Sequence, residues 1–231
     1  MTGAPKQRTL WSRPLAAVAR SHPSAFLLAA QLLSLLVYPA VDESSGGRLL
    51  FGAVALVVVP LAVWVVNRSP AVRWVAWMLA VPAMLLTACA VLFALPALLP
   101  WSAMLEAALY FYAAGGLIAY MLRDHEVSAD ELFAAGATFT LLAWGFAYAF
   151  FVCQACYPDS FVSAIEPERP RRWLELLSLS FTNLSATGLG DIVPAGSLAR
   201  VLVMLEQFAG VGYIATVVSR LIGLTLVRHG R

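Results

Sequence analysis

Long apolar segments separated by short polar stretches constrain the fold of this chain more than any other feature. Crossing a membrane as a helix takes about 20 mostly apolar residues. Only 12% of the 231 residues are charged and 61% are apolar, whereas soluble domains carry about 25% charged residues. The segments long enough to cross are 24–41, 49–66, 72–95, 102–122, 132–153 and 198–227. The sequence therefore predicts an all-α integral membrane protein with six transmembrane helices.

A seventh apolar segment, residues 173–186, is too short to span and runs directly into a glycine-rich stretch. Irregular backbone at membrane depth is tolerated only where protein buries it or where it lines a water-filled cavity. We therefore expect a re-entrant loop, made of a half-span helix followed by non-helical backbone.

The distribution of Lys and Arg predicts that both ends of the chain are cytoplasmic. One set of loops and termini carries Lys6, Arg8, Arg13, Arg20, Arg68, Arg73, Arg123, Arg228 and Arg231, and the opposite set carries Arg48, Arg169, Arg171, Arg172 and Arg200. The first apolar segment could instead be a signal peptide. Residues 10–20 could lie along the inner membrane surface as an interfacial helix or form a disordered tail.

The glycine-rich stretch reads Thr-Asn-Leu-Ser-Ala-Thr-Gly-Leu-Gly-Asp-Ile-Val-Pro over residues 182–194. Alternating glycines allow backbone conformations in which successive carbonyls point the same way. Four such strands around one axis would form stacked rings of oxygens that replace the water shell of a cation. Taken alone, the same stretch could be an ordinary glycine-rich turn.

With its flanking segments, the stretch resembles the pore domain of potassium channels, whose usual filter reads Thr-Val-Gly-Tyr-Gly-Asp. The resemblance covers residues 132–227 and implies an outer helix, a turret, a pore helix, a filter and an inner helix. Pro194 and Arg200 also match family positions. Since each chain carries one filter, the resemblance implies a homotetramer.

The resemblance also assigns roles to individual residues. The filter would be Ala186, Thr187, Gly188, Leu189, Gly190 and Asp191, with K⁺ bound by the backbone carbonyls of Thr187, Gly188, Leu189 and Gly190. Gly210 would be the gating hinge of the inner helix, and Thr182 and Glu206 would support the filter. No cofactor besides the permeant K⁺ ions is expected, and the partners would be membrane lipid and monovalent cations, without nucleic acid.

Two filter positions depart from the family pattern. Ala186 lacks the hydroxyl of the family's first threonine, and Leu189 lacks the hydrogen-bonding hydroxyl of its tyrosine. These departures leave two functions open, a potassium-selective channel and a weakly selective Na⁺/K⁺ channel of the same architecture.

The first four segments occupy the place of a voltage sensor but lack its gating arginines, because residues 102–122 contain no basic residue. We expect 1–23 to be a cytoplasmic segment, 24–122 a sensor-like four-span domain, 123–131 a linker and 132–231 the pore domain. The four segments could equally be unrelated to sensors and only pack around the pore. Glu106 is expected near an outer helix start, where water and the helix dipole stabilise its charge.

The remaining polar residues do not favour an enzyme. The histidines, His22, His125 and His229, are far apart in sequence, and a catalytic site needs a nucleophile with a base or a metal cluster. A transporter subunit with several filter-like loops is disfavoured because there is one such loop. Cys153 and Cys156 could form disulfides or be free thiols. The short loops suggest a bacterial plasma membrane protein.

Overall fold

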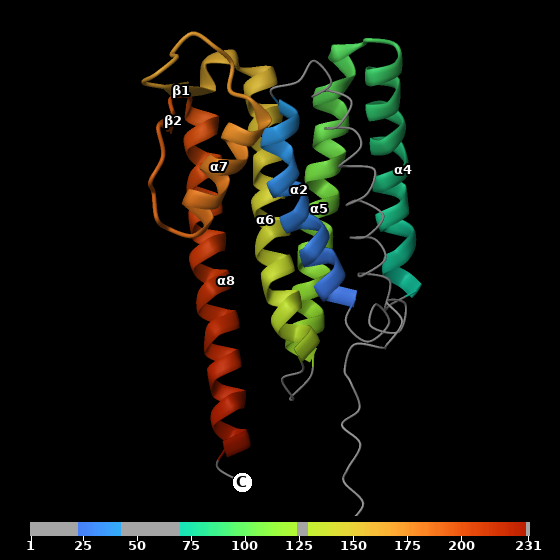
Figure 1. Ribbon diagram of the computed structural model, residues 1–231, viewed down its shortest axis with the longest axis vertical. Coiled ribbons are helices and arrows are strands. Elements are labelled where there is room, and N and C mark those ends of the chain that lie inside the picture. The colour runs from blue at the N-terminus through green and yellow to red at the C-terminus, as the bar shows by residue number, and fades with distance from the viewer. Residues whose placement is uncertain (1–22, 43–69, 124–128, 230–231) are drawn as a thin grey trace, which may run out of the picture.

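The computed structural model describes residues 23–42, 70–123 and 129–229. Its helices are α2 (Pro23–Asp42), α4 (Pro70–Leu92), α5 (Leu99–Arg123), α6 (Ala129–Cys156), α7 (Trp173–Leu184) and α8 (Ser197–His229), with short 3₁₀ turns at Pro96–Leu98 and Pro158–Ser160. Two strands, β1 (Phe161–Ser163) and β2 (Ile192–Pro194), complete the order. The long helices stand side by side in one bundle (Figure 1).

Four helices of the described part are long and apolar enough to cross a membrane. They cover Trp74–Leu92, Pro96–Arg123, Asp130–Cys156 and Ser197–Val217. The α2 helix adds a shorter apolar stretch, Pro23–Tyr38. A helix satisfies its own backbone hydrogen bonds, which lipid cannot do, so the apolar segments fold in this way. The mostly helical structure with four candidate spans agrees with the predicted all-α membrane protein. The count of six transmembrane helices stays a prediction, because the segment 49–66 and the interfacial stretch 10–20 lie outside the described residues.

The α5 and α6 helices pack against each other along their length. Their connection, residues 124–128, lies outside the described part. Near the end away from the C-terminus, the rings of Tyr110 and Tyr148 stack with centroids 5.6 Å apart. Tyr110 also meets Trp144 edge-on at 5.8 Å. Such aromatic pairs hold the two helices in a fixed register.

The α2 helix runs beside α6 and is tied to the start of α6 by a buried carboxylate. Backbone and side chain of Ser24 donate to the two oxygens of Asp130 at 3.2 and 3.1 Å. At the other end of α2, Tyr38 packs on Trp173, the first residue of α7, with centroids 5.3 Å apart. Trp173 also meets Trp144 of α6 at 5.4 Å. The aromatic cluster therefore anchors the start of α7 in the core of the bundle.

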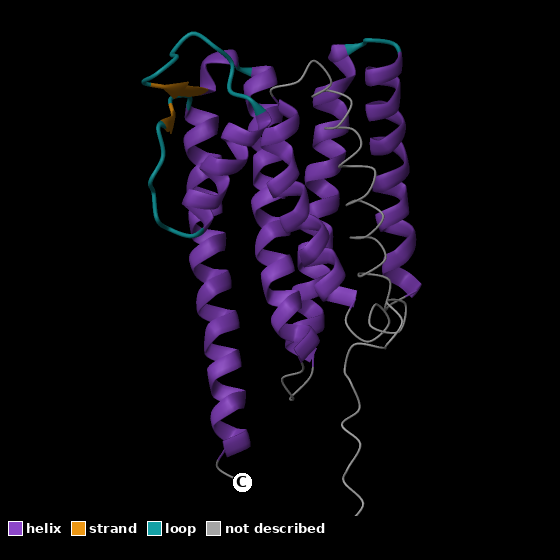
Figure 2. Cartoon of the chain, in the orientation of Figure 1, coloured by secondary structure: helices purple, strands orange, loops and turns teal. Residues whose placement is uncertain are grey.

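The α7 helix is short and lies between α6 and α8 at the end of the molecule opposite the C-terminus (Figure 1). The chain leaves α7, runs down and turns back as a loop, then rises into β2 before α8 begins (Figure 2). The β2 strand pairs antiparallel with β1, with Phe161 opposite Pro194 and Ser163 opposite Ile192. The sequence did not predict this small sheet. It joins the end of the loop that leads into α8 to the segment that follows α6.

Candidate functional site: the re-entrant segment

The start of α7 is held by charged and polar groups of the preceding loop. The Glu175 carboxylate accepts from the backbone N–H of Arg172 at 2.6 Å, as expected for an acid in the first helical turn. The guanidinium of Arg169 donates to Glu175 Oε1 at 2.7 Å and to Oε2 at 3.2 Å. Burial opposes ionisation of Glu175, but the hydrogen bonds from Arg169 and Arg172 and the charges of Arg169 and Arg171 outweigh it and lower its pKa.

Gln154 at the end of α6 fixes the same loop from the other side. Its side-chain amide donates to the carbonyl of Arg171 at 2.9 Å and accepts from the N–H of Arg171 at 2.8 Å. The pair is buried, so both backbone groups are satisfied away from water. The direction in which α7 enters the bundle is thereby set by two elements.

After α7 the backbone turns sharply and becomes the predicted filter. The carbonyl oxygen of Thr182 accepts from the N–H groups of Thr187 and Gly188 at 3.0 and 3.1 Å. Ala186 and Gly188 both have positive φ, 59° and 65°. For an alanine this conformation costs roughly 1–2 kcal/mol, so the turn is held by its hydrogen bonds and not by the preference of residue 186.

Residues 186–191 are all exposed on the isolated protomer. The side chain of Leu189 is 81% exposed. An apolar side chain in this position is covered only if another molecule or membrane surrounds it. The structure thus brings the six predicted filter residues together as one continuous surface segment.

Asp191 is braced by a residue that the sequence did not single out. Ser163 of β1 donates its hydroxyl to Asp191 Oδ2 at 3.0 Å. The pairing of β1 with β2 places Ser163 opposite Ile192, next to Asp191 in sequence. Thr182 donates its hydroxyl to the carbonyl of Leu179 at 2.8 Å within its own helix. Its Oγ1 still lies 3.8 Å from the position that a Cβ on Gly190 would occupy.

Glu206 of α8 is fully buried against α7, the helix that precedes the predicted filter segment. Its carboxyl group contacts the hydroxyl of Ser180. The same hydroxyl donates to the carbonyl of Ala143 on α6 at 2.7 Å. One serine of α7 therefore connects the outer helix α6 with the inner helix α8. Asn183, about one turn after Ser180 on α7, accepts through Oδ1 from the side-chain amide of Gln207 on α8 at 3.4 Å.

Gly210 marks the closest approach of α8 to α7. A Cβ built on Gly210 would lie 2.0 Å from the carbonyl oxygen of Leu184, the last residue of α7. No side chain fits there without moving one helix. The α8 helix runs unbroken from Ser197 to His229 through this position. The absence of a side chain at Gly210 is thus a packing requirement in this conformation, and bending at Gly210 stays a prediction.

Two expectations away from the filter have different outcomes. Glu106 is not in a watery environment, because it is 2% exposed and accepts from Thr87 of α4 at 3.2 Å. The expectation placed it near a helix start, but α5 begins at Leu99, two turns earlier.

Cys153 and Cys156 are both free thiols, the first buried and the second exposed. Cys153 Sγ lies 3.6 Å from Ser160 Oγ.

The comparison with known families identifies the class of protein. A family model described as "Ion channel" matches residues 107–226, which is more than half of the chain. No curated protein and no solved structure matches the chain. The matched residues include α6, the re-entrant α7 with its exposed loop, and most of α8. The chain therefore belongs to this ion-channel family and contains an ion-channel pore domain.

Proposed function

We propose that the protein is a potassium-selective channel that conducts K⁺ passively through a homotetrameric pore. The observation that carries the proposal is the exposed segment 186–191, which alternates two positive-φ positions and follows a half-span helix. The carbonyls of Thr187, Gly188, Leu189 and Gly190 are the proposed ligands of the dehydrated ion. No covalent chemistry is involved.

An apolar face of α8 supports assembly. Val201, Met204, Phe208 and Val211 recur at helical spacing and are 46%, 58%, 82% and 55% exposed on the protomer. Four copies arranged around one axis would cover this face and bring four filter segments together. In that assembly the C-terminal end of α7 would point toward the central cavity, where its partial negative charge favours a cation.

Asp191 would then stand at the mouth of the pore, held by Ser163. A ring of four carboxylates raises the local cation concentration. Glu206, through Ser180, would keep α7 in place behind the filter. Gly210 would give α8 a point at which it can bend when the inner gate opens.

A second candidate function is a weakly selective Na⁺/K⁺ channel of the same architecture. It is favoured by Leu189, whose exposed apolar side chain cannot brace the filter with a hydrogen bond as a tyrosine would. Ala186 likewise contributes no side-chain oxygen at the inner ion site. Both changes would leave the width of the filter less tightly held.

Reversal potentials distinguish the two functions. The full chain is reconstituted in planar bilayers with K⁺ on one side and Na⁺ on the other. We expect a reversal potential close to the K⁺ equilibrium value, and a Gly190→Ala variant without selective current. A reversal potential near zero would reject potassium selectivity and leave the second function. Absence of cation current, in protein that migrates as an intact oligomer, would reject both.

The proposal includes a location. We place the protein in a bacterial plasma membrane because its loops are short. The distribution of Lys and Arg places both chain ends in the cytoplasm. The end of the bundle that carries α7 would then face outward. The sensor-like helices α4 and α5 would lie against the α6 helix of their own subunit, since only residues 124–128 separate α5 from α6.

A further inference from the structure

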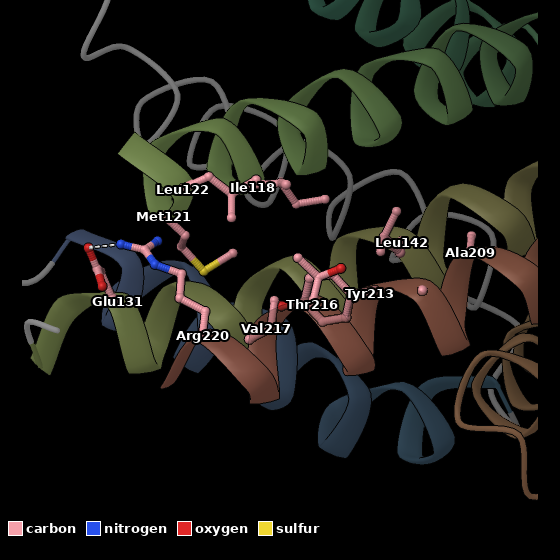
Figure 3. A pocket seen from close by; sticks show the side chains of 11 residues that line it. Ile118, Met121, Leu122, Glu131, Leu142, Ala209, Tyr213, Thr216, Val217 and Arg220 are labelled. Carbon is pink, nitrogen blue, oxygen red and sulfur yellow. Dashed lines mark ion pairs between the residues drawn. The ribbon is translucent and has the colours of Figure 1, made fainter. Parts of the chain in front are cut away.

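A cavity of about 250 Å³ lies between α5, α6 and α8. Its walls come from three helices: Ile118, Met121 and Leu122 of α5, Leu142 of α6, and Tyr213 and Val217 of α8 (Figure 3). It lies in the half of the bundle that holds the C-terminal part of α8. None of the residues assigned to the filter lines it.

The walls are almost entirely apolar. The hydroxyl of Tyr213 donates to the carbonyl of Ala135 at 2.6 Å, so its polar tip is already satisfied. In another protein, an engineered apolar cavity of about 150 Å³ stays dry and binds ligands of the size of benzene. Water is therefore a poor occupant here, and a hydrocarbon is a good one.

One end of the cavity is charged. Arg220 of α8 and Glu131 of α6 face each other there with 3.9 Å between Arg220 Nη2 and Glu131 Oε1 (Figure 3). This separation is longer than a hydrogen bond. The side chains are 15% and 4% exposed, so the guanidinium is the more accessible of the two. Arg123 follows at the end of α5, one residue after Leu122, and is exposed.

We propose that this cavity binds one acyl chain of an anionic phospholipid, with the phosphate next to the Arg220 guanidinium. Basic pockets between transmembrane helices are suited to acidic lipid headgroups, and guanidinium groups pair with phosphate in a bidentate geometry. The apolar walls and the single charged end match an amphiphile with one tail and one anionic head. The membrane supplies this ligand at high concentration.

The site has a consequence for the inner helix. The part of α8 that lines the cavity begins at Ala209 and continues past Gly210. A chain lying between α5 and α8 would resist movement of this part of α8 toward α5. This effect on the inner helix rests on the proposed channel function, whereas lipid binding itself does not.

Photolabelling tests the site directly. The full chain is reconstituted in phosphatidylcholine vesicles that contain a minor fraction of phosphatidylglycerol with a diazirine in its acyl chain. After irradiation, mass spectrometry maps the labelled residues. We expect adducts on the segments around Ile118 and Val217, above the level found on α4. Uniform labelling of all lipid-facing helices would overturn the proposal.

A filling substitution and its matched control test whether the cavity is the site. Val217→Trp should abolish labelling around Ile118, because the indole occupies the space of the chain. Val81→Trp, on the exposed surface of α4, should leave it unchanged. If Val217→Trp does not migrate as the wild-type oligomer, Ile118→Phe replaces it. Undiminished labelling in a folded filling variant would contradict the proposal.

The charged pair distinguishes a headgroup site from a structural ion pair. Arg220→Gln should lower labelling by the phosphatidylglycerol probe about fivefold, the change that corresponds to about 1 kcal/mol per basic residue at a membrane surface. Labelling by a phosphatidylcholine probe should change little. Glu131→Gln should raise phosphatidylglycerol labelling, because it removes the competing carboxylate. Equal losses in both variants would mean that the pair only stabilises the fold, and would overturn the headgroup assignment.

These readouts do not depend on conduction. A protein that fails the reversal-potential experiment can still be labelled, and a selective channel can still lack the lipid. Cross-links from this cavity to a second copy of the chain would show that a neighbouring subunit fills it, which would also refute the proposal.

Discussion

The contact between α7 and α8 and the contact among α4, α5 and α6 are built in the same way around a buried glutamate. Glu206 meets the hydroxyl of Ser180 and, through it, α6. Glu106 meets the hydroxyl of Thr87, with Tyr148 of α6 as a second hydrogen-bonding neighbour. Only the first contact includes the helix that carries the exposed loop. Similar polar contacts therefore hold the helix before the predicted filter segment in one place and helices away from that segment in the other.

The strongest test of this difference is steric. Gly210→Ala places a methyl group against the Leu184 carbonyl, so α8 must move away from α7. We expect a loss of about 3 kcal/mol or more, as for severe overpacking, together with loss of selective current. Thermal unfolding of the oligomer in detergent and bilayer recordings measure the two effects.

Two other glycines serve as controls for Gly210. A Cβ on Gly212 of α8 or on Gly115 of α5 meets nothing within 4 Å. Alanine at either position should be neutral or stabilising by up to about 1 kcal/mol, because alanine favours helix. If Gly210→Ala behaved like these controls, the close contact between α7 and α8 would be wrong.

The two glutamates provide the next test. Glu206→Ala and Glu106→Ala should each cost about 1–3 kcal/mol of stability, the range for leaving a buried hydrogen-bonding partner unsatisfied. Only Glu206→Ala should also change the K⁺ to Na⁺ permeability ratio, because only Glu206 holds α7. Unfolding and reversal potentials are measured on both variants. Equal effects on permeability would remove the distinction between the two contacts.

A glutamine at position 206 sharpens the same test. Ser180 has one hydroxyl proton and two oxygen neighbours, from Ala143 and Glu206. A glutamine side chain can donate to Ser180 Oγ while Ser180 donates to Ala143. Glu206→Gln should therefore retain selectivity where Glu206→Ala does not.

A smaller effect is expected at the outer end of the filter. Ser163→Ala removes the hydroxyl that donates to Asp191 and should cost about 0.5–1.5 kcal/mol. We expect faster decline of the K⁺ current, because Asp191 is less firmly held. Ser102→Ala removes a hydroxyl that bonds the Leu99 carbonyl within α5. That control should leave the time course of the K⁺ current unchanged. An equal change in both variants would show that the hydrogen bond from Ser163 does not hold Asp191.

The smallest effect concerns pH. The pKa of Glu175 is lowered in the folded protein. Its contribution to stability is therefore complete above the ordinary value of 4.5 and is lost as the pH falls through the lower folded value. Exposed ion pairs are worth about 0–1 kcal/mol. The oligomer's unfolding temperature should fall less below pH 4.5 in Glu175→Gln than in wild type. Parallel curves would contradict the assigned role of the Arg169–Glu175 pair.

The sequence predicted the elements that depend on local composition and residue spacing. The start of α7 at Trp173, the acid in its first turn and the exposed loop after it all follow from composition and spacing. Helix ends differ by a few residues, as for α5, which begins at Leu99 instead of Ser102. Hydropathy locates a helix well because lipid leaves the backbone no alternative.

The sequence could not predict contacts that join distant segments. Ser163 and Asp191 are 28 residues apart and meet because β1 pairs with β2. Glu106 was placed in water because helix length alone does not tell which face another helix covers. The sequence predicts that Gly210 is a hinge of the inner helix. Its close approach to Leu184 follows only from how α7 and α8 pack.

Ion density on the symmetry axis of the purified oligomer tests the central claim most directly. We expect four chains around one axis, with K⁺ density at successive levels beside the carbonyls of Thr187, Gly188, Leu189 and Gly190. Density should disappear from these levels when K⁺ is replaced by Na⁺. A particle without four-fold symmetry, or a filter segment 186–191 that lies away from the axis, would contradict the account.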